Sequence, residues 1–284
     1  MSDDEIRALL KKYNVRPTKK HGQSFLKSHK IAREIVDAAD ITNDDSVLEI
    51  GGGLGILTRI LVERARHVYV VELDPGLSSA LKDMFSSQEN ISIIEGDALS
   101  VQLPEVTKIV SNLPYSISSE ITFRILQELN FEQAILMYQK EFAARLQATP
   151  GSSEYSRLSV NIQYLGIVEH ILDVPANLFY PEPAVDSVVV RLKKVRHEPQ
   201  ARSEDVFFWM INGIFSYPNK KLRNALRIWF RNLDVDQKLV DDVLKHCKGQ
   251  SRDDDKLRTI PIENLILLSD SILMFIEEGK LPRP

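Results

Sequence analysis

The chain has 284 residues, 43% of them hydrophobic, which is long for one domain and gives two domains enough apolar residues for real cores. Its single cysteine excludes an internal disulfide, and we find no apolar run long enough to cross a membrane and no signal or transit peptide, so we expect a cytoplasmic protein. The formal net charge of −4 excludes a uniformly basic nucleic-acid binder, so any such contact must come from local clusters.

The first predicted elements are two helices, at residues 4–11 and 28–40, with a basic loop between them that contains Lys19 and Lys20. Residues 46–50 then form a short apolar run that predicts a buried strand. Because helix 28–40 leads directly into this strand, we expect the sheet of the first domain to begin here.

A glycine-rich turn follows this strand and precedes a helical pattern at residues 56–62. Glycines such as Gly51 and Gly53 let the backbone turn sharply and approach a ligand with no Cβ in the way. Their spacing is G-x-G-x-G, whereas dinucleotide sites use G-x-G-x-x-G and place the pyrophosphate at a helix N-terminus. The turn therefore favours a ligand with ribose and adenine but no phosphate, namely S-adenosylmethionine.

Two acids stand at the ends of the next two predicted strands. The strand at 67–71 ends at Glu72, where an acid can accept hydrogen bonds from both ribose hydroxyls. The strand at 91–95 is followed by Asp97, which is placed to accept from an adenine amino group. Either acid alone is ordinarily a solvated loop carboxylate, but two acids and a glycine loop at successive strand ends indicate a cofactor site.

The next predicted strand, at 108–111, ends in Asn112-Leu113-Pro114-Tyr115. The Asn carbonyl and a nearby main-chain carbonyl can each accept an N–H bond from an exocyclic amine. Proline fixes φ and so aims this backbone, while the tyrosine ring can stack on a base. Alone, these four residues fit an ordinary strand-to-helix turn equally well. Because they follow a predicted cofactor site, they predict a place where a base nitrogen receives a methyl group.

Strands and helices alternate to about residue 165, which predicts a parallel sheet with helices on both faces. Residues 167–174 and 187–192 are two late strands without a long helix between them, so we expect an antiparallel pair at the sheet edge. Helical patterns then dominate, at 204–215, 218–230, 235–247 and 261–278. We therefore predict a catalytic domain at residues 1–196 and a helical domain at 197–284.

With these segments in place, the sequence resembles the KsgA family of ribosomal RNA adenine N6,N6-dimethyltransferases, in forms closer to archaeal and eukaryotic members. The matching segments occur in the family's order and are G-Q-S-F-L at 22–26, V-L-E-I-G-G-G-L-G at 47–55, V-E-L-D at 71–74, G-D-A-L at 96–99, N-L-P-Y at 112–115, M-Y-Q-K-E at 137–141, F-Y-P-E-P-A-V-D-S at 179–187 and K-K-L-R-N-A-L at 220–226. One position departs from the family, because Ser24 stands where an asparagine or another amide or ring side chain is usual. Serine is shorter, which weakens the expectation of a side-chain contact there.

The resemblance implies a Rossmann-like class I methyltransferase fold, α/β with a mostly parallel seven-stranded sheet, plus a small C-terminal all-α domain. It implies S-adenosylmethionine as cofactor, no metal, and catalysis by the segment Asn112, Leu113, Pro114 and Tyr115. Tyr115 and Phe179 are expected to stack on the two faces of a flipped base. The expected cofactor contacts are Gln23, Ser24, Leu26, Gly51, Gly53, Glu72, Asp97, Ala98 and Asn112.

The implied substrate is a pair of adjacent adenosines near the 3′ end of small-subunit ribosomal RNA, each receiving two methyl groups in an assembly intermediate of the subunit. Basic clusters support an RNA partner, with acids concentrated elsewhere, as at 253–255, and we expect a monomer. The expected RNA contacts are Lys19, Lys20, Lys220, Lys221, Arg223 and Arg227, the last four on one predicted helix face.

Three alternatives remain open. The first is a large-subunit ribosomal RNA adenine methyltransferase, which shares the N-L-P-Y logic but is less consistent with the segment at 220–226. The second is a ribosome-assembly factor on the same fold without turnover, which the intact Glu72, Asp97, Asn112 and Tyr115 disfavour. A nicotinamide dehydrogenase is a distant third because of the glycine spacing.

Overall fold

The computed structural model describes residues 1–17, 23–195, 197–247 and 254–284. The chain divides into two compact units, Met1–Ala143 with Gly166–Val195, and Ala144–Leu165 with Arg196–Pro284. The sequence pattern predicts a single boundary after residue 196. The structure instead groups 144–165 with the C-terminal residues, because Tyr155, Val160 and Tyr164 are buried in the core of the helical unit.

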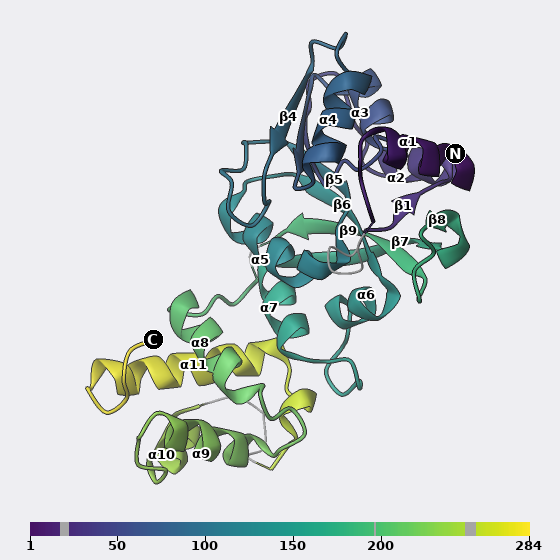
Figure 1. Ribbon diagram of the computed structural model, residues 1–284. Coiled ribbons are helices and arrows are strands. Elements are labelled where there is room, and N and C mark those ends of the chain that lie inside the picture. The colour runs from purple at the N-terminus through teal and green to yellow at the C-terminus, as the bar shows by residue number, and fades with distance from the viewer. Residues whose placement is uncertain (18–22, 196, 248–253) are drawn as a thin grey trace. The chain divides into compact units, whose positions relative to one another are not determined.

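The first unit (Figure 1) is built on a seven-stranded, mostly parallel sheet. The order of its strands is β4-β3-β2-β5-β6-β9-β7. Its strands are β2 (Ser46–Ile50), β3 (His67–Glu72), β4 (Ile91–Glu95), β5 (Lys108–Asn112), β6 (Gln133–Gln139), β7 (Gly166–Val174) and β9 (Ser187–Lys194). β9 runs antiparallel to both β6 and β7, which confirms the antiparallel pair expected from the two late strands. This is the mostly parallel, Rossmann-like α/β sheet that the resemblance implied.

Parallel strands with both faces covered read as continuous apolar runs, and every residue of β2 is buried. The helices of this unit are α1 (Asp3–Lys12), α2 (His29–Asp37), α3 (Thr58–Arg64), α4 (Pro75–Met84) and α5 (Ser118–Glu128). Their starts follow local chemistry: Asp74 caps α4 by accepting from the N–H groups of Gly76 and Leu77, and Pro75 fills the first helical position.

A second, two-stranded sheet was not expected from the sequence. It pairs β1 (Phe25–Leu26) with β8 (Phe179–Tyr180) in antiparallel register, Phe25 opposite Tyr180 and Leu26 opposite Phe179. Strands of two residues have no periodicity to detect, so they can be seen only in the folded chain. The pairing brings the G-Q-S-F-L segment next to the F-Y-P-E-P segment.

The helical unit contains α7 (Arg157–Leu165), α8 (Glu204–Ile214), α9 (Leu222–Asn232), α10 (Leu239–His246) and α11 (Ile262–Glu277), while α6 (Lys140–Leu146) crosses the boundary between the units. This confirms a helical C-terminal region, although α9 starts later than residue 218. Before it, Lys220 O accepts from Leu257 N, Leu222 N donates to Asp255 O, and the backbone of Lys221 is extended. None of the helices formed by the described residues is both long and apolar enough to cross a membrane.

Candidate active site

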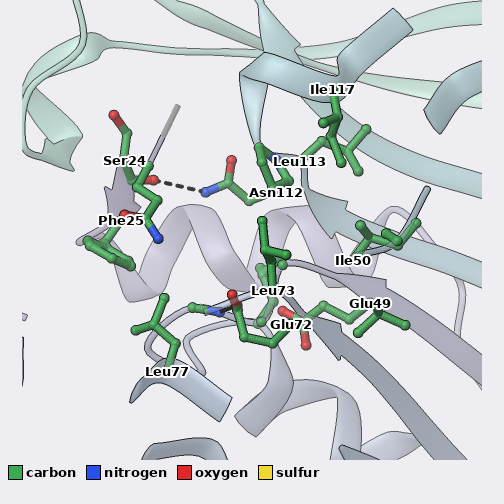
Figure 2. Close-up of a pocket in the computed structure, with 18 of the residues that line it drawn as sticks. Ser24, Phe25, Glu49, Ile50, Glu72, Leu73, Leu77, Asn112, Leu113 and Ile117 are labelled. Atoms are coloured by element: carbon green, nitrogen blue, oxygen red, sulfur yellow. Dashed lines mark hydrogen bonds between the residues drawn. The ribbon is translucent and has the colours of Figure 1, made fainter. Parts of the chain in front are cut away.

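A pocket of about 320 Å³ opens in the first unit where the parallel strands β2, β3 and β5 end and where the chain leaves β4 (Figure 2). The carboxyl ends of strands are the usual place for ligands in open α/β sheets. Every residue expected to contact a cofactor lines this pocket: Gln23, Ser24, Leu26, Gly51, Gly53, Glu72, Asp97, Ala98 and Asn112. The segments that carry them are far apart in sequence, so the sheet topology gathers them.

The glycine loop forms the floor of the pocket with bare backbone. Gly51 has φ +79°, and a Cβ there would lie 3.1 Å from Cδ of Pro114. Gly53 has φ +56°, and a Cβ there would lie 3.3 Å from the ring of Phe25. Both conformations are unfavourable for residues with side chains, and the close approaches join the loop to the N-L-P-Y turn and to the G-Q-S-F-L segment.

Glu72 is buried, with 5% of its surface exposed, and its carboxylate is held by main-chain donors. One oxygen accepts from Gly53 N and the other from Asp74 N, each at 3.0 Å. Burial raises the pKa of Glu72, and these two hydrogen bonds oppose that rise. A carboxylate has about four acceptor positions, so a pair of ribose hydroxyls could still bind to it.

A second buried acid, Glu49 in β2, lines the same pocket and was given no role from the sequence. It is 1% exposed and accepts a hydrogen bond of 2.6 Å from Oγ1 of Thr58. Burial raises the pKa of Glu49 to about 8, with the Thr58 bond opposing this and the charge of Glu72 adding to it. The raised pKa favours the neutral, protonated form of Glu49. An acid in the middle of a buried apolar strand was the signal for this group.

The turn after β4 carries Asp97 and Ala98. Asp97 Oδ1 accepts from Leu99 N at 2.9 Å, and this hydrogen bond fixes the orientation of the carboxylate. With one such bond, the carboxylate keeps acceptor capacity for an amino group in the pocket. Ala98 is buried and small, and it contributes an apolar surface to the pocket next to this acid.

Asn112 ends β5 and points into the pocket (Figure 2). Its Nδ2 donates to the main-chain carbonyl of Ser24 at 3.3 Å, which leaves Oδ1 as an acceptor for a ligand. The contribution of Ser24 is thus its backbone oxygen, which any residue at this position would supply. The departure from the family at residue 24 does not remove this contact.

Tyr115 stands at the start of a 3₁₀ turn, Tyr115–Ile117, next to the pocket. Its hydroxyl forms a 2.6 Å hydrogen bond with Oγ of Ser187, and burial raises the pKa of the phenol. Phe179, the other expected stacking ring, is only 1% exposed and belongs to a hydrophobic core cluster of the first unit. Its ring could meet a base only if the segment around it moved.

The basic residues expected to bind RNA lie in the helical unit, apart from Lys19 and Lys20, which fall outside the described residues. Arg223 and Arg227 are on α9, whereas Lys220 and Lys221 precede it, so the expectation of four cations on one helix face was wrong. The extended pairing of Lys221 with Lys256 is the physical reason.

The expectation that acids lie away from this cluster was also wrong. Asp254 Oδ1 is 3.1 Å from Nζ of Lys221, and Asp241 forms a salt bridge with Arg223. Arg227 approaches the same Asp241 at 4.0 Å. Part of the positive charge is therefore neutralised by neighbouring carboxylates.

Comparisons with known proteins agree with this geometry. The sequence profile of the family described as ribosomal RNA adenine dimethylase matches residues 14–248. A protein named probable ribosomal RNA small subunit methyltransferase A from Methanosarcina mazei is 46% identical over 221 residues, 78% of this chain and 81% of that protein. Another of the same name from Methanococcus maripaludis is 38% identical over 258 residues, 90% of this chain and 98% of that protein.

Two solved structures are similar to this chain over most of its length. A dimethyladenosine transferase from Plasmodium falciparum has a TM-score of 0.77 and 30% identity, covering 90% of this chain and 99% of its own. The 23S rRNA methyltransferase ErmE has a TM-score of 0.64 and 28% identity, covering 87% and 98% of the two chains. From the profile match and the identities over most of its length, this chain belongs to the ribosomal RNA adenine dimethylase family.

Proposed function

We propose that this pocket transfers methyl groups from S-adenosylmethionine to N6 of adenines in small-subunit ribosomal RNA. The observation that carries the proposal is the Asn112 amide, whose nitrogen is held by Ser24 O so that its oxygen faces the pocket beside the glycine loop and Tyr115. An acceptor so oriented suits an exocyclic amine, which brings two N–H donors.

The residues around the pocket fit the cofactor. The glycine loop leaves a cradle that a Cβ at Gly51 or Gly53 would fill, and the buried carboxylate of Glu72 stands behind it with acceptor capacity for ribose hydroxyls. Asp97 and Ala98 would take the adenine, and Gln23, Ser24 and Leu26 would close the opposite wall. These assignments are tested by calorimetric titration of S-adenosylhomocysteine, with NAD as the ligand that should give no response.

Bound S-adenosylmethionine supplies a methyl group on a sulfonium, which is an excellent leaving group and needs no activation by the protein. The difficulty lies in the acceptor, because the adenine N6 lone pair is delocalised into the ring. Asn112 Oδ1 and a main-chain carbonyl of Leu113 or Pro114 would accept the two N6 hydrogens and favour a pyramidal nitrogen whose lone pair points at the methyl group. This is catalysis by position and electrostatics. No base is required at the attack, because the nitrogen loses its proton readily afterwards.

The adenine must leave its stack to reach Asn112. Tyr115 would receive one face of it, in an orientation that the hydrogen bond to Ser187 fixes. For Phe179 to receive the other face, the segment at 179–186 would have to open, since the ring is buried in this structure. We assign the target to two adjacent adenosines near the 3′ end of the RNA, each dimethylated in an assembly intermediate, with the helical unit docking on the RNA.

The experiment that tests the proposal is incubation of the protein with radiolabelled S-adenosylmethionine and undermodified ribosomal subunits. Label in small-subunit RNA, recovered as N6,N6-dimethyladenosine, is the expected result. The similarity to ErmE makes large-subunit RNA the second candidate, and label there would replace the proposed substrate. Binding of cofactor without label in either subunit would favour an assembly factor that has lost turnover.

A further inference from the structure

One charged side chain outside the predicted site is attached to the part of the pocket that would hold adenine. Arg124 lies on α5, the helix that follows the N-L-P-Y turn, and its side chain is 15% exposed. Its Nη1 donates to the main-chain oxygen of Ala98 at 2.5 Å, and its Nη2 donates to that of Val101 at 2.8 Å. The two arms of one guanidinium thus hold two carbonyls of the turn that follows β4.

The same turn also has internal bonds that place Asp97. The N–H groups of Ser100 and Val101 both donate to Asp97 O at 2.9 Å, and Leu99 N donates to its side chain at the same distance. These bonds close the turn on itself but do not attach it to the rest of the protein. At its start the turn is attached to β3, where Gly96 N donates to Glu72 O at 2.9 Å. Arg124 attaches the rest of the turn to α5, and its own Nε donates to Oε2 of Glu128 at 2.8 Å.

We propose that Arg124 is a positioning residue that sets the place of Asp97 and Ala98 relative to Asn112, and thereby the selectivity of the pocket for the adenine ring of its cofactor. α5 begins directly after the turn that bears Asn112 and Tyr115, so one rigid helix connects the acceptor end of the pocket to its adenine end. The inference rests on the proposed binding of an adenosyl cofactor at this pocket.

Geometry makes arginine particularly suited to this position. Its planar fork presents several N–H donors at fixed angles, so it can hold two carbonyls and a carboxylate at once, whereas a lysine ammonium is a compact point donor on a flexible stem. Arg124→Lys should therefore retain the charge and lose part of the restraint, and Arg124→Met should lose all of it. In both variants the turn at 97–101 would keep its internal bonds but sample more than one position.

The test compares the binding of S-adenosylhomocysteine with that of S-inosylhomocysteine, in which an oxygen replaces the adenine amino group. The wild-type chain should prefer the adenosyl compound, because Asp97 accepts from that amino group. In Arg124→Met we expect this preference to fall by about tenfold, a loss of one well-placed hydrogen bond, with Arg124→Lys in between. Calorimetry measures both affinities without any RNA and without turnover.

Glu128→Gln is the matched control, since it removes the charge that contacts Arg124 but leaves both bonds to the turn. It should keep the wild-type preference. Hydrogen exchange of residues 97–103 should rise in folded Arg124→Met and remain unchanged in the control. If Arg124→Met does not fold, Arg124→Lys decides the matter alone.

A folded Arg124→Met or Arg124→Lys variant with the wild-type ratio of affinities would overturn the inference, and so would an equal loss of both affinities, which a general structural defect predicts. A wild-type chain that bound neither compound would instead overturn the proposed function, so the two failures are distinguishable.

Discussion

In the pocket of the first unit, the charged side chains are held by main-chain groups. In the basic segment of the helical unit, residues 220–227, cationic side chains instead form salt bridges with carboxylates. Glu72 accepts from two backbone N–H groups and retains acceptor positions for a ligand. Lys221 and Arg223 contact carboxylates of Asp254 and Asp241. A charged side chain that is positioned by backbone groups therefore keeps its charge available to a ligand. A charged side chain that is positioned by an oppositely charged one is partly neutralised.

The largest effect in either region is expected at Asn112, another polar group that the backbone positions. We expect Asn112→Ala to reduce methyl transfer by about 100-fold or more, as for other single donors or acceptors that stabilise a transition state, while cofactor affinity, to which Asn112 is one of several expected contacts, falls much less. Single-turnover methylation and S-adenosylhomocysteine calorimetry measure the two effects. Near-normal turnover in this variant would remove Asn112 from the chemical step.

Replacing Glu49 tests whether the pocket of the folded protein contains a neutral carboxyl group. Because its pKa is raised from 4.5 to about 8, its contribution to stability is fully present below pH 4.5 and is lost as pH rises through about 8. In the wild type, the free energy of unfolding should change by on the order of a few kcal/mol across this pH range, and Glu49→Gln should abolish that change. Chemical denaturation from pH 5 to pH 9 measures it. Parallel curves for wild type and variant would show that Glu49 does not titrate in this range.

Replacing Glu72 tests whether a carboxylate held by backbone N–H groups also accepts hydrogen bonds from the ligand. Glu72→Ala should weaken binding of S-adenosylhomocysteine by about 1–3 kcal/mol, because the ribose hydroxyls lose a charged acceptor. Glu95→Ala is the control, since Glu95 is opposite Glu72 on the neighbouring strand but is exposed and pairs with Lys82. Unchanged affinity in Glu72→Ala, or an equal loss in both variants, would exclude Glu72 as the ribose ligand.

The basic residues at 220–223 in the helical unit give the smallest expected effects. Neutralising Lys220, Lys221 and Arg223 together should weaken binding to the small subunit and reduce the log–log salt slope by roughly one for each phosphate group that the variant no longer binds. Cofactor binding should not change. A triple variant that binds the subunit as tightly as wild type at every salt concentration would mean that these residues only solvate the surface.

Asp241→Asn tests the same pairing in the opposite direction. If this carboxylate neutralises Arg223, its removal should strengthen RNA binding and steepen the salt slope by about one. Lys245→Gln serves as a control, because Lys245 is an exposed cation on α10 that pairs only locally with Asp242. Weaker binding in Asp241→Asn would show that the salt bridge holds Arg223 in its binding position.

Most strands of the seven-stranded sheet, their order along the chain and the polar residues at their ends could be predicted from the amino-acid pattern alone. Buried parallel strands are continuous apolar runs, and Gly51, Glu72, Asp97 and Asn112 stand at or just beyond the ends of such runs. The antiparallel final pair was also predictable, since no long helix separates the strands that became β7 and β9.

What each polar side chain contacts became known only from the folded chain. Ser24 serves Asn112 through its main chain, Glu49 is buried beside Glu72, and Arg124 reaches the turn after Asp97. Burial of Phe179, and the approach of Asp241 and Asp254 to the basic segment, likewise depend on tertiary packing. Such contacts join residues whose separation along the chain carries no periodic signal, so they are fixed by how elements pack and not by local pattern.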